Sequence, residues 1–242
     1  MFDMNKVLHP AQSRGAANHG WLRSFHSFSF ANYYNPQKMH FGVLRVLNDD
    51  EVAPSMGFGT HPHDNMEIIS IPLSGELKHK DSMGNEAIIK TGEIQVMSAG
   101  TGIQHSEFNA STSDPVKFLQ IWLFPNKKNV TPRYDQIQLP DLATHNELHQ
   151  VLSPNADDSG VWIHQNAWFH MGTFDAGTDQ SYTLKDARNG LYLFLIEGSI
   201  EIEGETLGAR DAIGLSDLNE VSFTSTSENT RVLLMEVPMH VS

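Results

Sequence analysis

The chain has 242 residues, of which 39% are hydrophobic and 19% are charged, a composition typical of a globular protein with a sizeable core. Its formal net charge is −13, which repels a phosphate backbone, and because no basic cluster offsets that charge we expect no direct nucleic-acid binding. The sequence contains no cysteine, so any bound metal would have only nitrogen and oxygen ligands. No apolar run approaches the length of a membrane span or a signal peptide, and we expect a cytoplasmic protein without membrane contact.

Short β-branched and aromatic runs, separated by turn residues, fill the first half of the chain. The spacing of roughly ten residues between runs is typical of a barrel or a sandwich. The predicted strands are Phe41 to Leu47, Met66 to Leu73, Ile94 to Met97 and Phe118 to Phe124.

Two residue pairs in this half carry the chemistry: His61 with His63, and His105 with Glu107. Alternate side chains of a strand share a face, so each pair would point to one side if both segments are extended. Two such strands side by side would present three imidazoles and one carboxylate to a single metal ion. The pattern alone is moderate support, because the chain has 13 histidines and some fall at this spacing by chance.

The sequences around these pairs, "HPHDNMEII" and "MSAGTGIQHSEFN", resemble the two motifs of the cupin superfamily and specifically those of the pirin family. The stretches "ANHGWLRSFHSFSFANYYNP" and "HKDSMGN" also resemble pirins. The resemblance is dense over residues 14 to 135 and looser beyond them. It implies an all-β fold of two cupin-like (jelly-roll) β-barrels packed together, with a metal site in the N-terminal barrel only.

A weak internal repeat agrees with two barrels. The segment "IPLSGELKHK", with Gly75, is similar to "FLIEGSIEIE", with Gly198, which lies 123 residues later. The same offset carries His61 and His63 onto Leu184 and Asp186, so the second copy lacks the imidazoles. We expect a metal-binding domain over residues 1–130, a connecting segment over 131–160 with a short helix near Leu142 to Leu148, and a C-terminal domain without ligands over 161–242.

The ligand set leaves the metal open. Imidazole and carboxylate suit Fe, Mn, Co, Ni, Cu or Zn. Tetrahedral zinc would be filled by four protein ligands and would be structural, whereas an octahedral ion would keep two open positions. The resemblance to pirins implies one divalent metal per chain, most commonly Fe(II).

The resemblance also implies a quercetin 2,3-dioxygenase-like activity, in which O₂ adds across a bond of a flavonol or similar enolisable aromatic substrate, the ring opens and carbon monoxide leaves. Glu107 would be both ligand and base. A non-enzymatic, iron-responsive regulatory protein of the pirin type is the alternative, and a zinc-stabilised scaffold is a third possibility. We expect a monomer.

Glu67 competes with Glu107 for the carboxylate role. It has the same strand parity as His63, so it too could face the ion. In pirins the matching ligand is the glutamate of the tripeptide His-Ser-Glu, here Glu107. We therefore expect Glu67 to contact a ligand rather than the metal.

Overall fold

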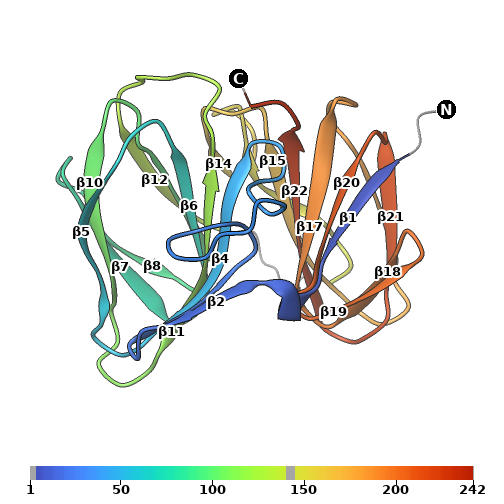
Figure 1. Ribbon diagram of the computed structural model, residues 1–242, viewed down its shortest axis with the longest axis horizontal. Helices are drawn as coiled ribbons and strands as arrows, with labels where there is room; N and C mark the ends of the chain where they lie inside the picture. The colour runs from blue at the N-terminus through green and yellow to red at the C-terminus, as the bar shows by residue number, and fades with distance from the viewer. Residues whose placement is uncertain (1–3, 140–144, 242) are drawn as a thin grey trace.

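The computed structural model describes residues 4–139 and 145–241, and this part of the chain is almost entirely β-structure (Figure 1). Its one helical element is a 3-10 turn, η1 (Ala11–Ser13). No helix in the described ranges has the length and apolarity that crossing a membrane requires. Four sheets build two barrels that lie side by side, each with one seven-stranded and one four-stranded sheet. The predicted all-β fold of two barrels is confirmed.

The N-terminal barrel is drawn in blue to green in Figure 1. Its larger sheet has the order β12-β9-β6-β11-β4-β3-β2 and its smaller sheet the order β5-β10-β7-β8. The strands are β2 (Gly15–Asn18), β3 (Leu22–His26), β4 (Leu44–Val52), β5 (Gly57–His63), β6 (Glu67–Ser74), β7 (Glu76–Asp81), β8 (Glu86–Lys90), β9 (Glu93–Ser98), β10 (Ile103–Asn109), β11 (Val116–Leu123) and β12 (Arg133–Gln138).

The C-terminal barrel repeats this design. Its larger sheet has the order β1-β20-β17-β22-β15-β13-β14 and its smaller sheet the order β16-β21-β18-β19. The strands are β1 (Asn5–His9), β13 (His149–Ser153), β14 (Val161–Trp162), β15 (Trp168–Phe174), β16 (Asp179–Thr183), β17 (Asn189–Glu197), β18 (Ser199–Ile202), β19 (Glu205–Gly208), β20 (Ala212–Ser216), β21 (Glu220–Ser225) and β22 (Thr230–Pro238).

The internal repeat seen in the sequence corresponds to equivalent hairpins of the two barrels. Gly75 joins β6 to β7 and Gly198 joins β17 to β18, and both have positive φ, at 80° and 85°. A left-handed conformation of this kind favours glycine because it has no Cβ atom. The two segments therefore share a backbone turn as well as a pattern of residues.

Successive residues of the larger N-terminal sheet face two different sides, the apolar core between the barrels and the interior of the N-terminal barrel. On β11, Leu119, Ile121 and Leu123 belong to a large apolar cluster that also contains residues of the C-terminal barrel, such as Phe169 and Phe194. The side chains between them, Gln120 and Trp122, line a cavity inside the N-terminal barrel. The two large sheets therefore pack face to face, and their opposite faces enclose the barrel interiors.

The interiors of the two barrels differ. Inside the C-terminal barrel a second apolar cluster fills the space, with Phe174, Leu193 and Phe223 among its buried members. The interior of the N-terminal barrel keeps a cavity that polar residues share with aromatic ones.

Strand pairing departs from the predicted segments at two places. Residues 5–9 form β1, which pairs with β20 of the C-terminal barrel (Figure 1). Residues 133–138 form β12, which pairs with β9 of the N-terminal barrel. The N-terminal barrel therefore lacks residues 5–9 and extends past residue 130, in contrast to the expected domain of residues 1–130. The sequence did not show this because pairing between distant segments leaves no local signal. Residues 142–144 of the predicted helix near Leu142 to Leu148 lie outside the described ranges, and its other residues, His145 to Leu148, are not helical.

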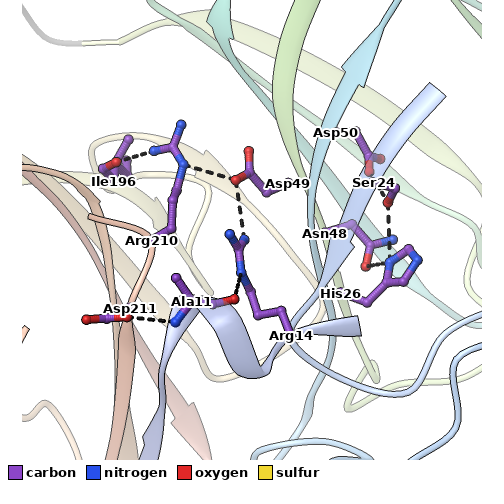
Figure 2. Close-up of polar contacts among 10 residues, drawn as sticks. All are labelled: Ala11, Arg14, Ser24, His26, Asn48, Asp49, Asp50, Ile196, Arg210 and Asp211. Carbon is purple, nitrogen blue, oxygen red and sulfur yellow. Dashed lines mark hydrogen bonds and ion pairs between the residues drawn. The ribbon is translucent and has the colours of Figure 1, made fainter. Parts of the chain in front are cut away.

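An ion-pair cluster connects the segment that follows β1, with Ala11 and Arg14, to both barrels (Figure 2). Asp49 on β4 lies 3.3 Å from Arg14 Nη1 and 3.0 Å from Arg210 Nε, which belongs to the C-terminal barrel. The Ala11 amide donates to Asp211 Oδ1 at 2.7 Å, and an Arg210 guanidinium N–H donates to the Ile196 carbonyl. Asp49 thereby holds two cations from different parts of the molecule.

Asp49→Ala is expected to lower the free energy of unfolding by about 3 kcal/mol, because it leaves two partly buried guanidinium groups without their counterion. Glu51→Ala is the matched control on the same strand. Its carboxylate meets only exposed cations, at 3.6 Å and 3.9 Å, and its loss should cost below about 1 kcal/mol. Urea unfolding measures both variants, and equal small losses would contradict the assigned role of Asp49.

Candidate metal centre

Neighbouring strands β5 and β10 of the smaller N-terminal sheet carry the two residue pairs singled out in the sequence. His61 is paired with His105 in the register, and His63 is paired with Ile103. Buried and more exposed residues alternate along β10, and both His105 and Glu107 lie on the buried face. The expected strand geometry of both pairs is confirmed.

Three imidazoles converge between these strands. The ligand nitrogens of His61, His63 and His105 all lie within 4.8 Å of one another. Nε2 of His63 and Nε2 of His105 are 3.0 Å apart. His61 Nδ1 lies 2.8 Å from the Gly59 carbonyl, to which it donates, so the ring is fixed with Nε2 free to accept.

Burial favours the neutral form of two of these imidazoles. Desolvation, together with a smaller effect of the neighbouring histidines, lowers the pKa of His63 to about 4 and that of His105 to about 2. A metal ligand must be the unprotonated imidazole. The arrangement therefore has the protonation state that a metal site needs.

Glu107 lies on the same face of β10 as His105 and is buried. Ser70 Oγ donates to one of its oxygens at 3.0 Å, and Gln120 Nε2 donates to the other at 2.8 Å. Burial raises the pKa of Glu107 to about 7, and the two hydrogen bonds partly offset this effect. Both oxygens are thus oriented by neighbours on β6 and β11.

His79 is the member of this region to which the sequence assigned no role. It is paired with Glu107 across β7 and β10 and is completely buried. Ligand atoms of His79, His105 and Glu107 form a second group within 4.8 Å, which shares His105 with the three imidazoles. Nε2 of His79 lies 3.2 Å from Asp81, and its buried Nδ1 has no hydrogen-bond partner among the described residues. Only the register between β7 and β10 reveals the proximity.

The expectation that Glu67 contacts a metal ligand is not met by the geometry. The turn before β6, with Asn65 at a φ of 45°, breaks the strand parity that linked Glu67 to His63. Glu67 instead lies on the same face of β6 as Ile69 and Ile71, which pack toward the C-terminal barrel. Ser98 Oγ donates to its carboxylate at 2.7 Å.

Glu67→Gln is expected to change how stability depends on pH. Burial raises the pKa of Glu67 from 4.5 to about 7, with hydrogen bonds from Ser98 and the His164 backbone opposing the shift. The folded state then holds a proton that the unfolded state has lost, so wild-type stability falls as the pH rises between these two values. The amide should remove this loss, which amounts to at most about 3 kcal/mol.

Unfolding of wild type and Glu67→Gln at pH 5 and pH 8 measures the effect. Relative to the wild type, the free energy of unfolding of the variant should be higher at pH 8 than at pH 5. A stability difference that is the same at both pH values would contradict the assignment of a buried, neutral carboxyl group.

A cavity of about 380 Å³ opens beside the imidazoles inside the N-terminal barrel. His61, Glu107 and Gln120 lie on its polar side, and aromatic rings form much of the rest. The rings are Trp21, Phe30, Phe58 and Trp122. The size and the mixed lining are typical of a site for a small organic molecule.

The donor set fits a divalent transition metal. Three imidazole nitrogens lie within 4.8 Å of one another, and a buried carboxylate lies close to one of them. No lysine or arginine of the described residues forms an ion pair with Glu107. His61, His63, His105 and Glu107 could therefore hold one ion, and His79 lies where it could replace a ligand or contact one.

The histidines near the start of the C-terminal barrel form no comparable group among the described residues. His145 lies 2.6 Å from Asp175, and His149 lies on β13. His170 packs against Tyr182 inside the barrel.

Comparison with known proteins agrees with this architecture. The model of the family described as pirin matches residues 7–123, and that of the quercetinase C-terminal cupin domain matches residues 150–237. The quercetin 2,3-dioxygenase of Escherichia coli (strain K12) is 41% identical over 231 residues, covering 96% of this chain and 98% of the relative. A pirin-like protein of Caulobacter vibrioides is 37% identical over 226 residues, or 93% of this chain and 97% of that protein.

Solved structures are similar over the whole chain. The crystal structure of the bacterial pirin YhhW from Escherichia coli, in complex with nickel(II), has a TM-score of 0.91 at 38% sequence identity and covers 97% of this chain and 99% of that one. A quercetin 2,3-dioxygenase from Acinetobacter baumannii, 23% identical, has a TM-score of 0.79 and covers 96% of this chain and 86% of that one, which shows a shared fold. The two barrels, the family models and the relatives together identify the chain as a member of the pirin family.

Proposed function

We propose that this protein is a metal-dependent dioxygenase that cleaves a flavonol, or a similar enolisable aromatic compound, with O₂ and releases carbon monoxide. The observation that carries the proposal is the convergence of three imidazoles, with Glu107 close to one of them, beside a cavity that His61, Glu107 and several aromatic rings line. Relatives described as quercetin 2,3-dioxygenase support this reaction class.

In this proposal His61, His63, His105 and Glu107 hold one divalent ion. When bound, the ion would supply Lewis-acid and redox chemistry to the substrate hydroxyl and to O₂. Fe(II) is the proposed resident metal, following the resemblance to pirins, and the nickel(II) complex of the Escherichia coli pirin supports a divalent site in this family.

The chain's own residues bind the substrate and move its proton. Trp122 and Phe58 flank the cavity and suit the faces of a planar ring system. The Glu107 carboxylate accepts the proton of the flavonol 3-hydroxyl, and Ser70 and Gln120 hold it in place for that transfer. The apolar walls exclude water from the opened ring.

Oxygen uptake with quercetin tests the proposal. Protein stripped by a chelator and reloaded separately with Fe(II), Ni(II), Co(II), Mn(II) or Cu(II) should consume O₂ with at least one of these metals and not without metal. Absence of uptake in every loaded sample, with one metal per chain confirmed, would reject the dioxygenase and favour a metal-responsive regulatory protein of the pirin type.

A further inference from the structure

A row of polar side chains runs across the interior face of the larger N-terminal sheet. Ser70 on β6 is paired with Gln120 on β11, Gln120 is paired with Asn48 on β4, and Asn48 is paired with His26 on β3. Ser70 and Gln120 hold Glu107, so the row begins beneath the candidate metal centre. Its other end lies two strands beyond Gln120, a span of roughly 10 Å at ordinary strand spacing.

At that far end four side chains form one hydrogen-bonded cluster (Figure 2). His26 Nδ1 lies 2.9 Å from Asn48 Oδ1 and 3.3 Å from Ser24 Oγ. Ser24 Oγ in turn donates to Asp50 Oδ1. All four residues are buried and line the same cavity as His61 and Glu107.

The hydrogen bonds leave two acceptors toward the cavity. Because His26 Nδ1–H donates to Asn48, its Nε2 carries a lone pair. One Asp50 oxygen accepts from Ser24, and among the described residues the other receives no hydrogen bond. The cluster can therefore accept hydrogen bonds from a molecule in the cavity.

Asp50 differs in this respect from its neighbour Asp49. Asp49 points toward the C-terminal barrel and meets two arginines, whereas within the described residues no cation pairs with Asp50 (Figure 2). Burial raises the pKa of Asp50 to about 7, with a hydrogen bond from Ser24 opposing the shift and the charges of Asp49 and Glu107 adding to it. A buried carboxyl without a cation is costly unless another donor meets it.

The polar cluster is not required by the fold. The corresponding interior of the C-terminal barrel is filled by apolar side chains such as Leu193 and Phe223. Each barrel has one seven-stranded and one four-stranded sheet, so a cupin-like barrel closes without this row.

We propose that Asp50, Ser24 and His26 form a subsite that binds a phenolic hydroxyl of the substrate at the end of the cavity away from Glu107. This inference rests on the proposed function and identifies the residues that select among its substrates. The aromatic walls hold the ring system, Glu107 meets the reacting hydroxyl, and Asp50 accepts a hydrogen bond from a hydroxyl on a distant ring. A ring without that hydroxyl leaves the buried carboxyl unpaired, which is how such sites reject analogues.

Binding measured without O₂ tests the subsite separately from turnover. Metal-loaded protein is titrated anaerobically with quercetin, which has hydroxyls on its outer rings, and with 3-hydroxyflavone, which has only the reacting hydroxyl. Wild type should bind quercetin more tightly. Asp50→Asn and Ser24→Ala should each weaken quercetin binding by roughly 10-fold, the size of one buried hydrogen bond, and should leave 3-hydroxyflavone binding within about two-fold of wild type.

Glu51→Gln is the matched control. It makes the same acid-to-amide change on the adjacent residue of β4, does not line the cavity, and should keep the wild-type preference. Circular dichroism and metal content confirm the fold of each variant, and Ser24→Ala keeps the test valid if Asp50→Asn does not fold.

The outcomes separate the two proposals. The subsite alone would be overturned if folded Asp50→Asn and Ser24→Ala bound quercetin and 3-hydroxyflavone more weakly by the same factor. It would also be overturned if the wild type bound the two ligands equally well. Selective binding without O₂ uptake would support the subsite and reject the dioxygenase. Failure of metal-loaded wild type to bind either ligand would overturn both.

Discussion

His105→Ala should abolish stoichiometric metal binding. His105 belongs to both groups of potential ligands, and its Nε2 lies 3.0 Å from that of His63. Loss of even an outer partner of a ligand lowers metal affinity by about 10 to 100-fold, so loss of this central imidazole should lower it by more than about 100-fold. His61→Ala should give the same result.

Metal per chain, measured by elemental analysis after loading and gel filtration, checks this expectation. His145→Ala is the control, because its imidazole contacts Asp175 outside the N-terminal barrel and its loss should leave one metal per chain. Retention of one metal per chain in both His105→Ala and His61→Ala would reject the site.

Glu107→Gln should lower kcat for flavonol cleavage by about 10² to 10⁴-fold, the usual contribution of a general base. The amide keeps the size of the side chain and its place between Ser70 and Gln120, but it cannot take a proton. Glu67→Gln should have a much smaller effect on kcat, because Glu67 faces Ser98 and the C-terminal barrel rather than the cavity.

Oxygen uptake on quercetin gives kcat for the two variants, and metal content measured on the same samples separates loss of the base from loss of the ion. Unchanged kcat in metal-replete Glu107→Gln would remove Glu107 from the base role. A larger loss in Glu67→Gln than in Glu107→Gln would transfer the carboxylate role to Glu67.

The sequence predicted those parts of the structure that depend on local pattern. Two-residue alternation on β5 and β10 put His61 with His63, and His105 with Glu107, on the same faces, because a strand has a period of two. The glycine turns at Gly75 and Gly198 indicated an internal repeat, which corresponds to equivalent hairpins in the two barrels.

Predictions failed where the structure depends on turns or on register between distant strands. Glu67 was placed by parity with His63, but the turn at Asn65 interrupts the strand and turns Glu67 toward the other core. His79 meets Glu107 only through the pairing of β7 with β10. Residues 5–9 join the C-terminal sheet through a pairing that spans most of the chain.

The polar row from Ser70 to His26 was invisible in the sequence for the same reason. Its members lie on four strands, and no two of them are close in the chain. Each is an ordinary polar residue of a strand until the registers bring the row together across one face. Substrate-facing groups of a barrel therefore need the register, whereas ligand pairs on one strand do not.

The ratio of carbon monoxide released to O₂ consumed tests the central claim most directly, with metal-loaded wild type and His105→Ala compared on quercetin. For the wild type we predict one carbon monoxide released per O₂ consumed and incorporation of both atoms of labelled O₂ into the ring-opened product. For the variant we predict no O₂ consumption and no carbon monoxide release. Oxygen uptake without carbon monoxide, or equal rates in the wild type and the variant, would contradict the assignment of dioxygenase chemistry to this site.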